Sequence, residues 1–191
     1  IVGTQTTYTQ PPEIVRFGVD GSAVERVTRV NDATLAPFGL RPGESVTYAG
    51  AGGQEIQAWV VKPPDFDPGR KYPLVVLIHG GPQGSFDDHW HYRWNPQTYA
   101  GAGYAAVMID FHGSTGYGQE FCDSIQDNWG GWPLEDLQLG LADALRESSR
   151  EAVADLHASG IEIGMVTGDN KSTARRIADR DPYNCGSIPF P

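Results

Sequence analysis

The sequence predicts an α/β fold with a mainly parallel sheet and N-terminal β-hairpins. Residues 74–78 and 104–109 are short, continuous apolar runs of the kind found in strands buried on both faces. Leucines at positions 134, 137, 141 and 145 recur at spacings of three and four, which predicts an amphipathic helix. Strands that alternate with helices in this way favour a parallel sheet.

Two hairpins are predicted before the first buried strand. Between residues 13 and 28, apolar residues flank Asp20 and Gly21, a dipeptide that favours tight hairpin turns. A second hairpin is predicted from residues 45–49 and 54–61, on either side of a glycine-rich turn. Residues 1–10 are polar and rich in threonine, and we interpret them as an irregular lead-in segment.

The later elements continue the alternation. A short helix is predicted near residues 97–102, between the two buried strands. After the leucine-patterned helix, Ser148 and Glu151 form a capping-box pattern for a second helix that ends near Gly160. Residues 161–166 are a third strand candidate, and residues 172–179 a last helix.

Charge and hydropathy exclude several classes of partner. The net charge is −10, and seven acidic residues but no Lys or Arg lie between Arg93 and Arg146. A region this acidic repels nucleic acids and anionic lipids. No apolar run is long enough for a membrane span, and no signal peptide is recognisable. We therefore expect a cytoplasmic protein, and the start at Ile1 suggests processing or an excerpt.

Three motifs occur in a specific order. They are Lys71-Tyr72-Pro73 leading to HGGPQG at 79–84, FHGSTGYGQEF at 111–121, and NWGG at 128–131 followed by Glu135-Asp136-Leu137. Together they resemble the acylaminoacyl-peptidase branch of the prolyl oligopeptidase family. The resemblance covers residues 11–145, and its first part, residues 11–32, is similar to the last blade of that family's β-propeller. One departure is His112, where the family usually has Arg.

This resemblance implies a partial α/β-hydrolase-like three-layer sandwich. Residues 1–44 would be a lead-in and a blade-like hairpin, and residues 45–145 the N-terminal half of the hydrolase-like domain. The implied inherited activity is hydrolysis of peptide or acyl bonds by a serine nucleophile, with no cofactor. His79, Gly80 and Gly81 would form the loop whose backbone N–H groups stabilise the oxyanion. The alternative is a tight strand-to-loop turn that needs glycine for its backbone angles.

A second resemblance covers residues 142–180. The motifs are Ala142-Asp143-Ala144-Leu145-Arg146 and Met165-Val166-Thr167-Gly168-Asp169-Asn170. They are similar to the phosphorylation domain of heavy-metal P-type ATPases, so the chain resembles a chimera with a graft at residues 146–180 and an unassigned tail at 181–191. The Asp-Lys-Thr-Gly motif that carries the phosphorylated aspartate in that family is absent.

The serine nucleophile expected from the first resemblance is not found. No Gly-x-Ser-x-Gly occurs in the sequence, and Ser114 belongs to another loop of the family. We therefore predict a chain without peptidase activity. Two alternatives are a folded module without enzymatic function, and a phosphatase or ATPase activity with Asp110 or Asp169 as nucleophile.

The third strand candidate gives a geometric prediction. Right-handed crossovers place residues 161–166 parallel to residues 74–78 and next to them. Because functional loops gather where parallel strands end, one edge would collect the loop at 79–81 and five further candidates. These are Asp110, His112, Ser114, Thr167 and Asp169.

One cluster could bind a metal. Asp87, His89 and His91 combine carboxylate and imidazole groups that suit Zn²⁺ or Ni²⁺. Trp90, Tyr92 and Trp94 are interleaved with them. We favour the interpretation that this segment is the aromatic loop after the oxyanion glycines, with no metal.

We expect the chain to self-associate. In the hydrolase-like half-sheet, a strand edge with unpaired N–H and C=O groups favours pairing with another copy. Light scattering across a range of protein concentrations should show a mass above that of one chain. A monomer at the highest concentration would contradict this expectation.

Overall fold

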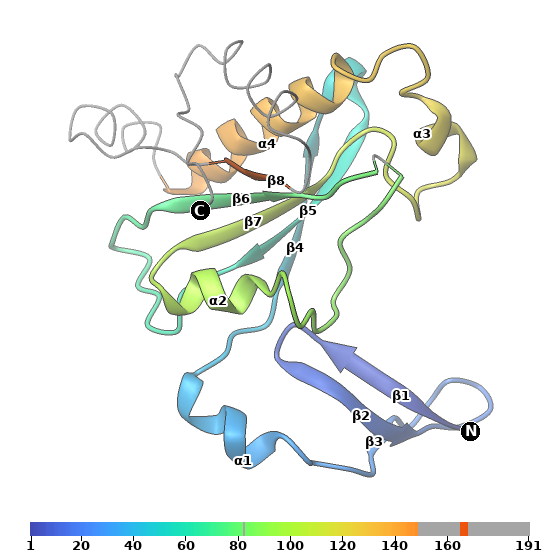
Figure 1. Ribbon diagram of the computed structural model, residues 1–191, viewed down its shortest axis with the longest axis vertical. Coiled ribbons are helices and arrows are strands. Elements are labelled where there is room, and N and C mark those ends of the chain that lie inside the picture. The colour runs from blue at the N-terminus through green and yellow to red at the C-terminus, as the bar shows by residue number, and fades with distance from the viewer. Residues whose placement is uncertain (82, 149–164, 168–191) are drawn as a thin grey trace.

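The computed structural model describes residues 1–81, 83–148 and 165–167, and its elements are shown in Figure 1. The N-terminal part contains β1 (Val2–Thr7), β2 (Gln10–Arg16), β3 (Glu25–Arg26), α1 (Asp32–Leu35) and η1 (Ala36–Phe38). The larger part contains β4 (Glu44–Ala49), η2 (Ala51–Gly53), β5 (Glu55–Val61), β6 (Leu74–Ile78), α2 (Pro96–Gly101), β7 (Ala105–Asp110), α3 (Gln119–Asp123), α4 (Trp132–Ser148) and β8 (Met165–Thr167).

A five-stranded sheet forms the middle layer of the larger part. Its strand order is β4-β5-β7-β6-β8, with β5 antiparallel to both β4 and β7. β6 runs parallel to β7 on one side and to β8 on the other. The α/β class is therefore confirmed, while the sheet is mixed and its parallel part is limited to β7, β6 and β8.

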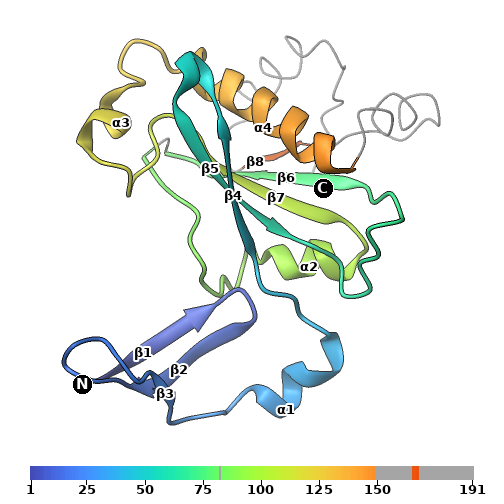
Figure 2. The same cartoon turned by 180° about the vertical axis from the view of Figure 1, so that it is seen from behind.

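Helices cover both faces of this sheet, as the two opposite views in Figures 1 and 2 show. On one face Leu137 and Leu141 of α4 pack against Ile109 and other strand residues. On the other face Ala100 of α2 packs in a cluster with Met108. α2 begins where Asn95 accepts a hydrogen bond from the Gln97 backbone N–H and Pro96 follows, a favourable helix start. The three layers predicted from the sequence are present.

The N-terminal residues form a separate three-stranded sheet in the order β1-β2-β3. The interpretation of residues 1–10 as an irregular segment is wrong, because Val2–Thr7 pairs antiparallel with β2. Its threonines and valine are β-branched, which suits a strand better than a loop. The predicted hairpin between residues 13 and 28 exists in reduced form, since only Val15 and Arg16 pair with β3.

The prediction for the third strand, residues 161–166, is confirmed for Met165 and Val166, and the strand extends one residue further, to Thr167. Met165, Val166 and Thr167 run parallel to β6, opposite Val76, Leu77 and Ile78 respectively. The predicted capped helix after Ser148, the helix at 172–179 and Asp169 lie outside the described residues. Ser148 itself is the last residue of α4.

A buried carboxylate joins α4 to the sheet. Asp136 is fully buried, and its Oδ1 accepts a hydrogen bond from the Ala51 backbone N–H at 2.8 Å. Its Oδ2 accepts from the backbone N–H of His112 at 2.7 Å and lies 2.6 Å from His112 Nδ1. At Gly140 a Cβ atom would lie only 2.5 Å from the Tyr48 hydroxyl, so this helix approaches the sheet closely only with glycine there.

None of the described helices combines the length and the apolar character that crossing a lipid bilayer requires.

We predict that Asp136→Asn destabilises the fold by roughly 1–3 kcal/mol, because the new amide N–H groups would face the N–H groups that now donate to the carboxylate. The midpoint of urea unfolding measures this change. The matched control is Glu135→Gln, an exposed position in the first turn of the same helix, which should lower the midpoint less than Asp136→Asn does because only an exposed helix-dipole interaction is lost. Equal midpoints for Asp136→Asn and the wild type would contradict the role of the buried carboxylate.

Candidate functional site

The C-terminal ends of the three parallel strands meet at one edge of the sheet. β6 ends at Ile78 beside Thr167 of β8, and β7 ends at Asp110. The loops that begin at His79 and Phe111 therefore start side by side. The structure thus brings residues 79–81, Asp110 and Thr167 to one edge, which is where ligands bind in open α/β sheets.

The loop after β6 exposes glycine backbone at this edge. Gly80 and Gly81 are both exposed. Gly81 has a φ of +133°, and a Cβ atom on it would lie 2.6 Å from the Gln83 backbone nitrogen. Only glycine takes up this conformation without strain. A substrate group can therefore approach the backbone of this loop closely.

His79 ties this loop to the loop that follows β7. Its Nε2 lies 2.9 Å from Ser114 Oγ, and its ring stacks on Phe111 with centroids 4.4 Å apart. Ser114 Oγ donates to the Phe111 carbonyl at 2.6 Å and can accept from His79 Nε2, while His79 Nδ1 lies 3.2 Å from the Gly80 carbonyl oxygen. Burial lowers the pKa of His79, which keeps the ring neutral near pH 7.

Ser114, His79 and Asp110 lie close together without the geometry of a hydrolytic triad. In a triad the serine and the carboxylate bind opposite nitrogens of the imidazole. Here Asp110 Oδ1 is 3.8 Å from Nε2, the same nitrogen that binds Ser114. Ser114 is also fully buried. This serine is placed to hold the loops together and cannot reach a substrate.

Asp110 is the most perturbed acid at the edge. It is fully buried, accepts from the Phe86 backbone N–H at 2.7 Å, and has Oδ2 2.6 Å from the Tyr117 hydroxyl. Burial raises the pKa of Asp110 to about 6. The Tyr117 hydroxyl also lies 2.8 Å from Gln57 Oε1, so one phenolic proton faces two acceptors. A protonated Asp110 satisfies both, because it donates to Tyr117 while Tyr117 donates to Gln57.

Sequence reasoning did not find the partners of Asp110. Gln57 faces Asp110 across the β5–β7 pairing, a register that no local pattern reveals. Tyr117 lies in the glycine-rich motif at 111–121 and could have been singled out there, since a tyrosine among glycines has little reason to be core.

His112 does not face the open end of the sheet but lies in the buried contact with α4. It is buried against Asp136, and its ring contacts Phe121 and Trp132 with centroid distances of 4.9 Å each. Its position makes it a packing and hydrogen-bonding residue of the α4 contact.

The polar side chains of the segment at 87–91 are engaged with protein partners. Asp87 pairs with His89, and Asp88 Oδ1 accepts from the Tyr8 backbone N–H at 2.6 Å. His91 Nδ1 accepts from the backbone N–H groups of Arg93 and Trp94. Within the described part of the chain, no three His, Cys, Asp or Glu side chains are grouped as metal ligands.

We predict that Asp110→Asn flattens the pH dependence of stability. The pKa of Asp110 is raised from 3.8 to about 6 on folding, so the wild type loses stability as the pH rises through this interval. Asparagine keeps the hydrogen bonds of the protonated acid, so the variant should be more stable than the wild type by roughly 3 kcal/mol at pH 8, and the difference should vanish below about pH 3. Urea unfolding at several pH values measures it.

The control for this prediction is Asp123→Asn, the same chemical change at an exposed position. Its stability curve should run parallel to that of the wild type. If the curve of Asp110→Asn is also parallel, the carboxyl group titrates normally in the folded protein.

Sequence comparisons relate the chain to a family of peptidases. Residues 90–158 match the model of the prolyl oligopeptidase family. Dipeptidyl-peptidase 5 of Schizosaccharomyces pombe is 44% identical over 170 residues, which cover 86% of this chain and 24% of that protein. A probable dipeptidyl-peptidase 5 of Aspergillus clavatus is 53% identical over 115 residues, which cover 60% of this chain and 16% of the relative. The chain therefore spans about a quarter or less of the length of these relatives.

Solved structures of peptidases share the fold of this chain. An acylaminoacyl peptidase of Pyrococcus horikoshii superimposes with a TM-score of 0.70 at 24% identity, over 87% of this chain and 25% of that one. A puromycin-hydrolyzing peptidase of Mycobacterium tuberculosis gives 0.63 at 22% identity, over 95% of this chain and 27% of that one. The fold is that of the α/β-hydrolase-type peptidases, and the chain is related to the prolyl oligopeptidase family.

Proposed function

We propose that the larger part of this chain carries the oxyanion-stabilising half of an acyl-hydrolase site, inherited from a serine peptidase. The observation that supports this most directly is the exposed glycine loop at 79–81, which is fixed at the end of β6 by the contact between His79 and Ser114. Backbone N–H groups in such a loop stabilise the negative charge that develops on a carbonyl oxygen. A peptide or ester carbonyl is the chemical group that fits this function.

We further infer that these 191 residues do not hydrolyse peptides by themselves. The sequence contains no Gly-x-Ser-x-Gly, and Ser114, which contacts His79, is buried and hydrogen-bonded. Oxyanion stabilisation without a nucleophile and a base gives only a small residual acceleration. The relatives that are dipeptidyl-peptidases suggest peptides as the substrates of a longer protein that contained this segment.

The chimeric origin of residues 142–180 is likewise a proposal, and it rests on the second sequence resemblance. The match to the peptidase family extends to residue 158, past the point at residue 145 where the motif resemblance ends. This overlap favours a peptidase origin for residues 142–158.

Hydrolysis of p-nitrophenyl acetate and p-nitrophenyl phosphate, measured side by side, separates the candidate functions. A non-enzymatic module turns over neither ester and unfolds cooperatively. Weak turnover of the acetate alone supports the oxyanion proposal. Mg²⁺-dependent turnover of the phosphate would favour a phosphatase activity with a nucleophile in the C-terminal tail. Asp110, the other candidate nucleophile, is fully buried, and both of its carboxyl oxygens are hydrogen-bonded.

A fluorophosphonate probe should label no serine stoichiometrically. The physical reason is that Ser114 is fully buried and donates its proton to the Phe111 carbonyl, so its oxygen is neither accessible nor activated. Intact-mass spectrometry after labelling measures this outcome. Stoichiometric modification at Ser114 would show that the serine becomes reactive and would overturn the assignment.

Mg-ATP should not bind with micromolar affinity. The net charge of −10 opposes a polyanionic nucleotide, and the sequence lacks the phosphorylated-aspartate motif of the ATPases. Isothermal titration calorimetry with Mg-ATP is the measurement, with a P-type ATPase nucleotide domain as the positive control. Saturable heats at micromolar concentrations would contradict this prediction.

A further inference from the structure

Four polar side chains form a hydrogen-bond chain that runs from the buried end of β7 to the surface of β4. Asp110 Oδ2 lies 2.6 Å from the Tyr117 hydroxyl, and this hydroxyl lies 2.8 Å from Gln57 Oε1. Gln57 Nε2 donates to Ser45 Oγ at 2.8 Å. Asp110 is fully buried, whereas Ser45 is exposed. The chain therefore connects a buried acid with a hydroxyl group in contact with solvent.

When Asp110 is protonated, all hydrogen bonds of the chain point toward the surface. Its Oδ1 accepts from the Phe86 backbone N–H at 2.7 Å, so the proton of the acid sits on Oδ2 and faces Tyr117. The acid donates to Tyr117, and Tyr117 donates to Gln57 Oε1. Gln57 Nε2 then donates to Ser45. Each hydrogen along the chain faces an acceptor, so the network is complete in this state.

When Asp110 is ionised, the same arrangement contains a conflict. Tyr117 then donates to the carboxylate, because a hydrogen bond to a charged acceptor is stronger than one to an amide oxygen. Gln57 Oε1 would be left 2.8 Å from an oxygen that has no hydrogen for it. A half-turn of the Gln57 amide removes the conflict, since Nε2 then donates to Tyr117. The Ser45 hydroxyl, which is both donor and acceptor, donates to Oε1 in this state.

The neighbouring titratable groups leave Asp110 as the member of the chain that changes its charge near pH 6. His79 Nε2 lies 3.8 Å from Asp110 Oδ1, and burial lowers the pKa of His79 and keeps its ring neutral near pH 7. Tyr8 and Tyr117 stay protonated, because burial raises the pKa of both phenols. Burial, with a smaller contribution from the Asp87 carboxylate, raises the pKa of Asp110 to about 6.

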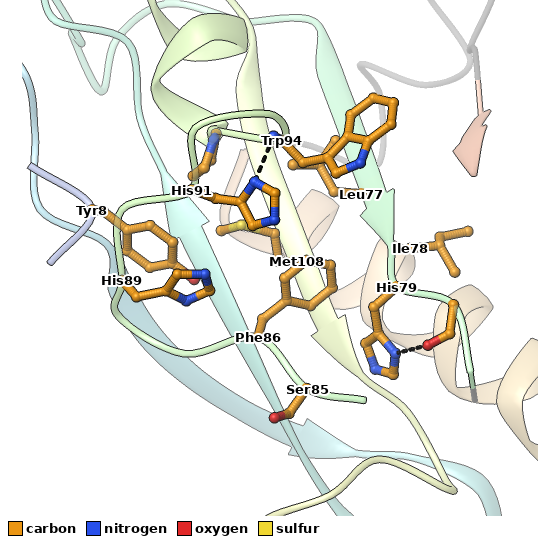
Figure 3. A pocket seen from close by; sticks show the side chains of 12 residues that line it. Tyr8, Leu77, Ile78, His79, Ser85, Phe86, His89, His91, Trp94 and Met108 are labelled. Atoms are coloured by element: carbon orange, nitrogen blue, oxygen red, sulfur yellow. Dashed lines mark hydrogen bonds between the residues drawn. The ribbon is translucent and has the colours of Figure 1, made fainter. Parts of the chain in front are cut away.

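We propose that this hydrogen-bond chain is a pH-sensitive switch, in which ionisation of Asp110 reverses the direction of every hydrogen bond and rotates the Gln57 amide by half a turn. The switch reaches the candidate site, because His79 and Phe86, which both contact Asp110, line the pocket of about 230 Å³ shown in Figure 3. A negative charge appears behind this wall of the pocket when Asp110 ionises. The proposal does not depend on the oxyanion role of the loop at 79–81.

NMR spectra of the whole chain, recorded from about pH 4 to about pH 8, test the proposal. The side-chain amide of Gln57 should shift with a midpoint near pH 6, and its NOE contacts should move from Ser45 at low pH to the Tyr117 ring at high pH. The Phe86 backbone amide, which donates to Asp110, should shift with the same midpoint. In Asp110→Asn the new amide donates to Tyr117 in place of the acid proton, so Gln57 should keep its low-pH contacts throughout.

Tyr117→Phe is the matched variant, because it interrupts the chain and leaves the acid in place. The Phe86 amide should still titrate in this variant, and Gln57 should no longer respond. The Gln97 side chain, which donates to the Arg41 carbonyl at 2.6 Å, is an internal reference that should not shift. A Gln57 side chain that keeps its contacts while the Phe86 amide titrates would overturn the proposal. Absence of a Phe86 titration near pH 6, or a Gln57 response that persists in Tyr117→Phe, would also overturn it.

Discussion

The carboxylate of Asp136 is the interaction on which the rest of the larger part depends. It is fully buried and binds backbone N–H groups from two separate segments, the turn before β5 and the loop after β7. A buried charge of this kind is tolerated only when its hydrogen bonds are complete. The position of α4 is therefore tied to the path of both segments, and none of the three can move alone without leaving a buried polar group unpaired.

The effect of this carboxylate extends to the candidate site along the chain. Asp136 fixes His112, and the neighbouring Phe111 supplies both the ring that stacks on His79 and the carbonyl that binds Ser114. His79 in turn begins the exposed glycine loop. The geometry of the loop at residues 79–81 is thus set by contacts that run back to α4. If this loop stabilises an oxyanion as proposed, its donors need no rearrangement when charge develops.

Polar groups buried near this edge differ in how their hydrogen bonds are satisfied. In the observed orientation of the Gln57 amide, Asp110, Tyr117 and Gln57 form a hydrogen-bond chain that is complete only when the acid is protonated, and burial raises the pKa of Asp110, which favours this state. The buried Tyr8 hydroxyl has no hydrogen-bond partner among the described residues.

The sequence by itself determined the elements whose patterns are local. The apolar runs at residues 74–78 and 104–109, the leucine spacing of α4 and the glycine-rich turn between β4 and β5 each predict an element that the structure contains. Even the parallel placement of Met165 and Val166 beside β6 followed from the handedness of crossovers, a rule that needs no side-chain detail. The strand at Val2–Thr7 was missed because most of its side chains are polar, which suggested an irregular segment. Its valine and threonines are β-branched, and such residues favour strands.

Only the tertiary structure decided which side chains meet. The pairing of Gln57 with Asp110 depends on strand register, and the contact of Asp136 with His112 depends on how closely α4 approaches the sheet. Tyr8 reaches a pocket whose other walls lie about 70 residues or more further along the chain. Local sequence patterns record the conformation that each segment favours. They do not record distances between segments, because these are set by packing of the whole core.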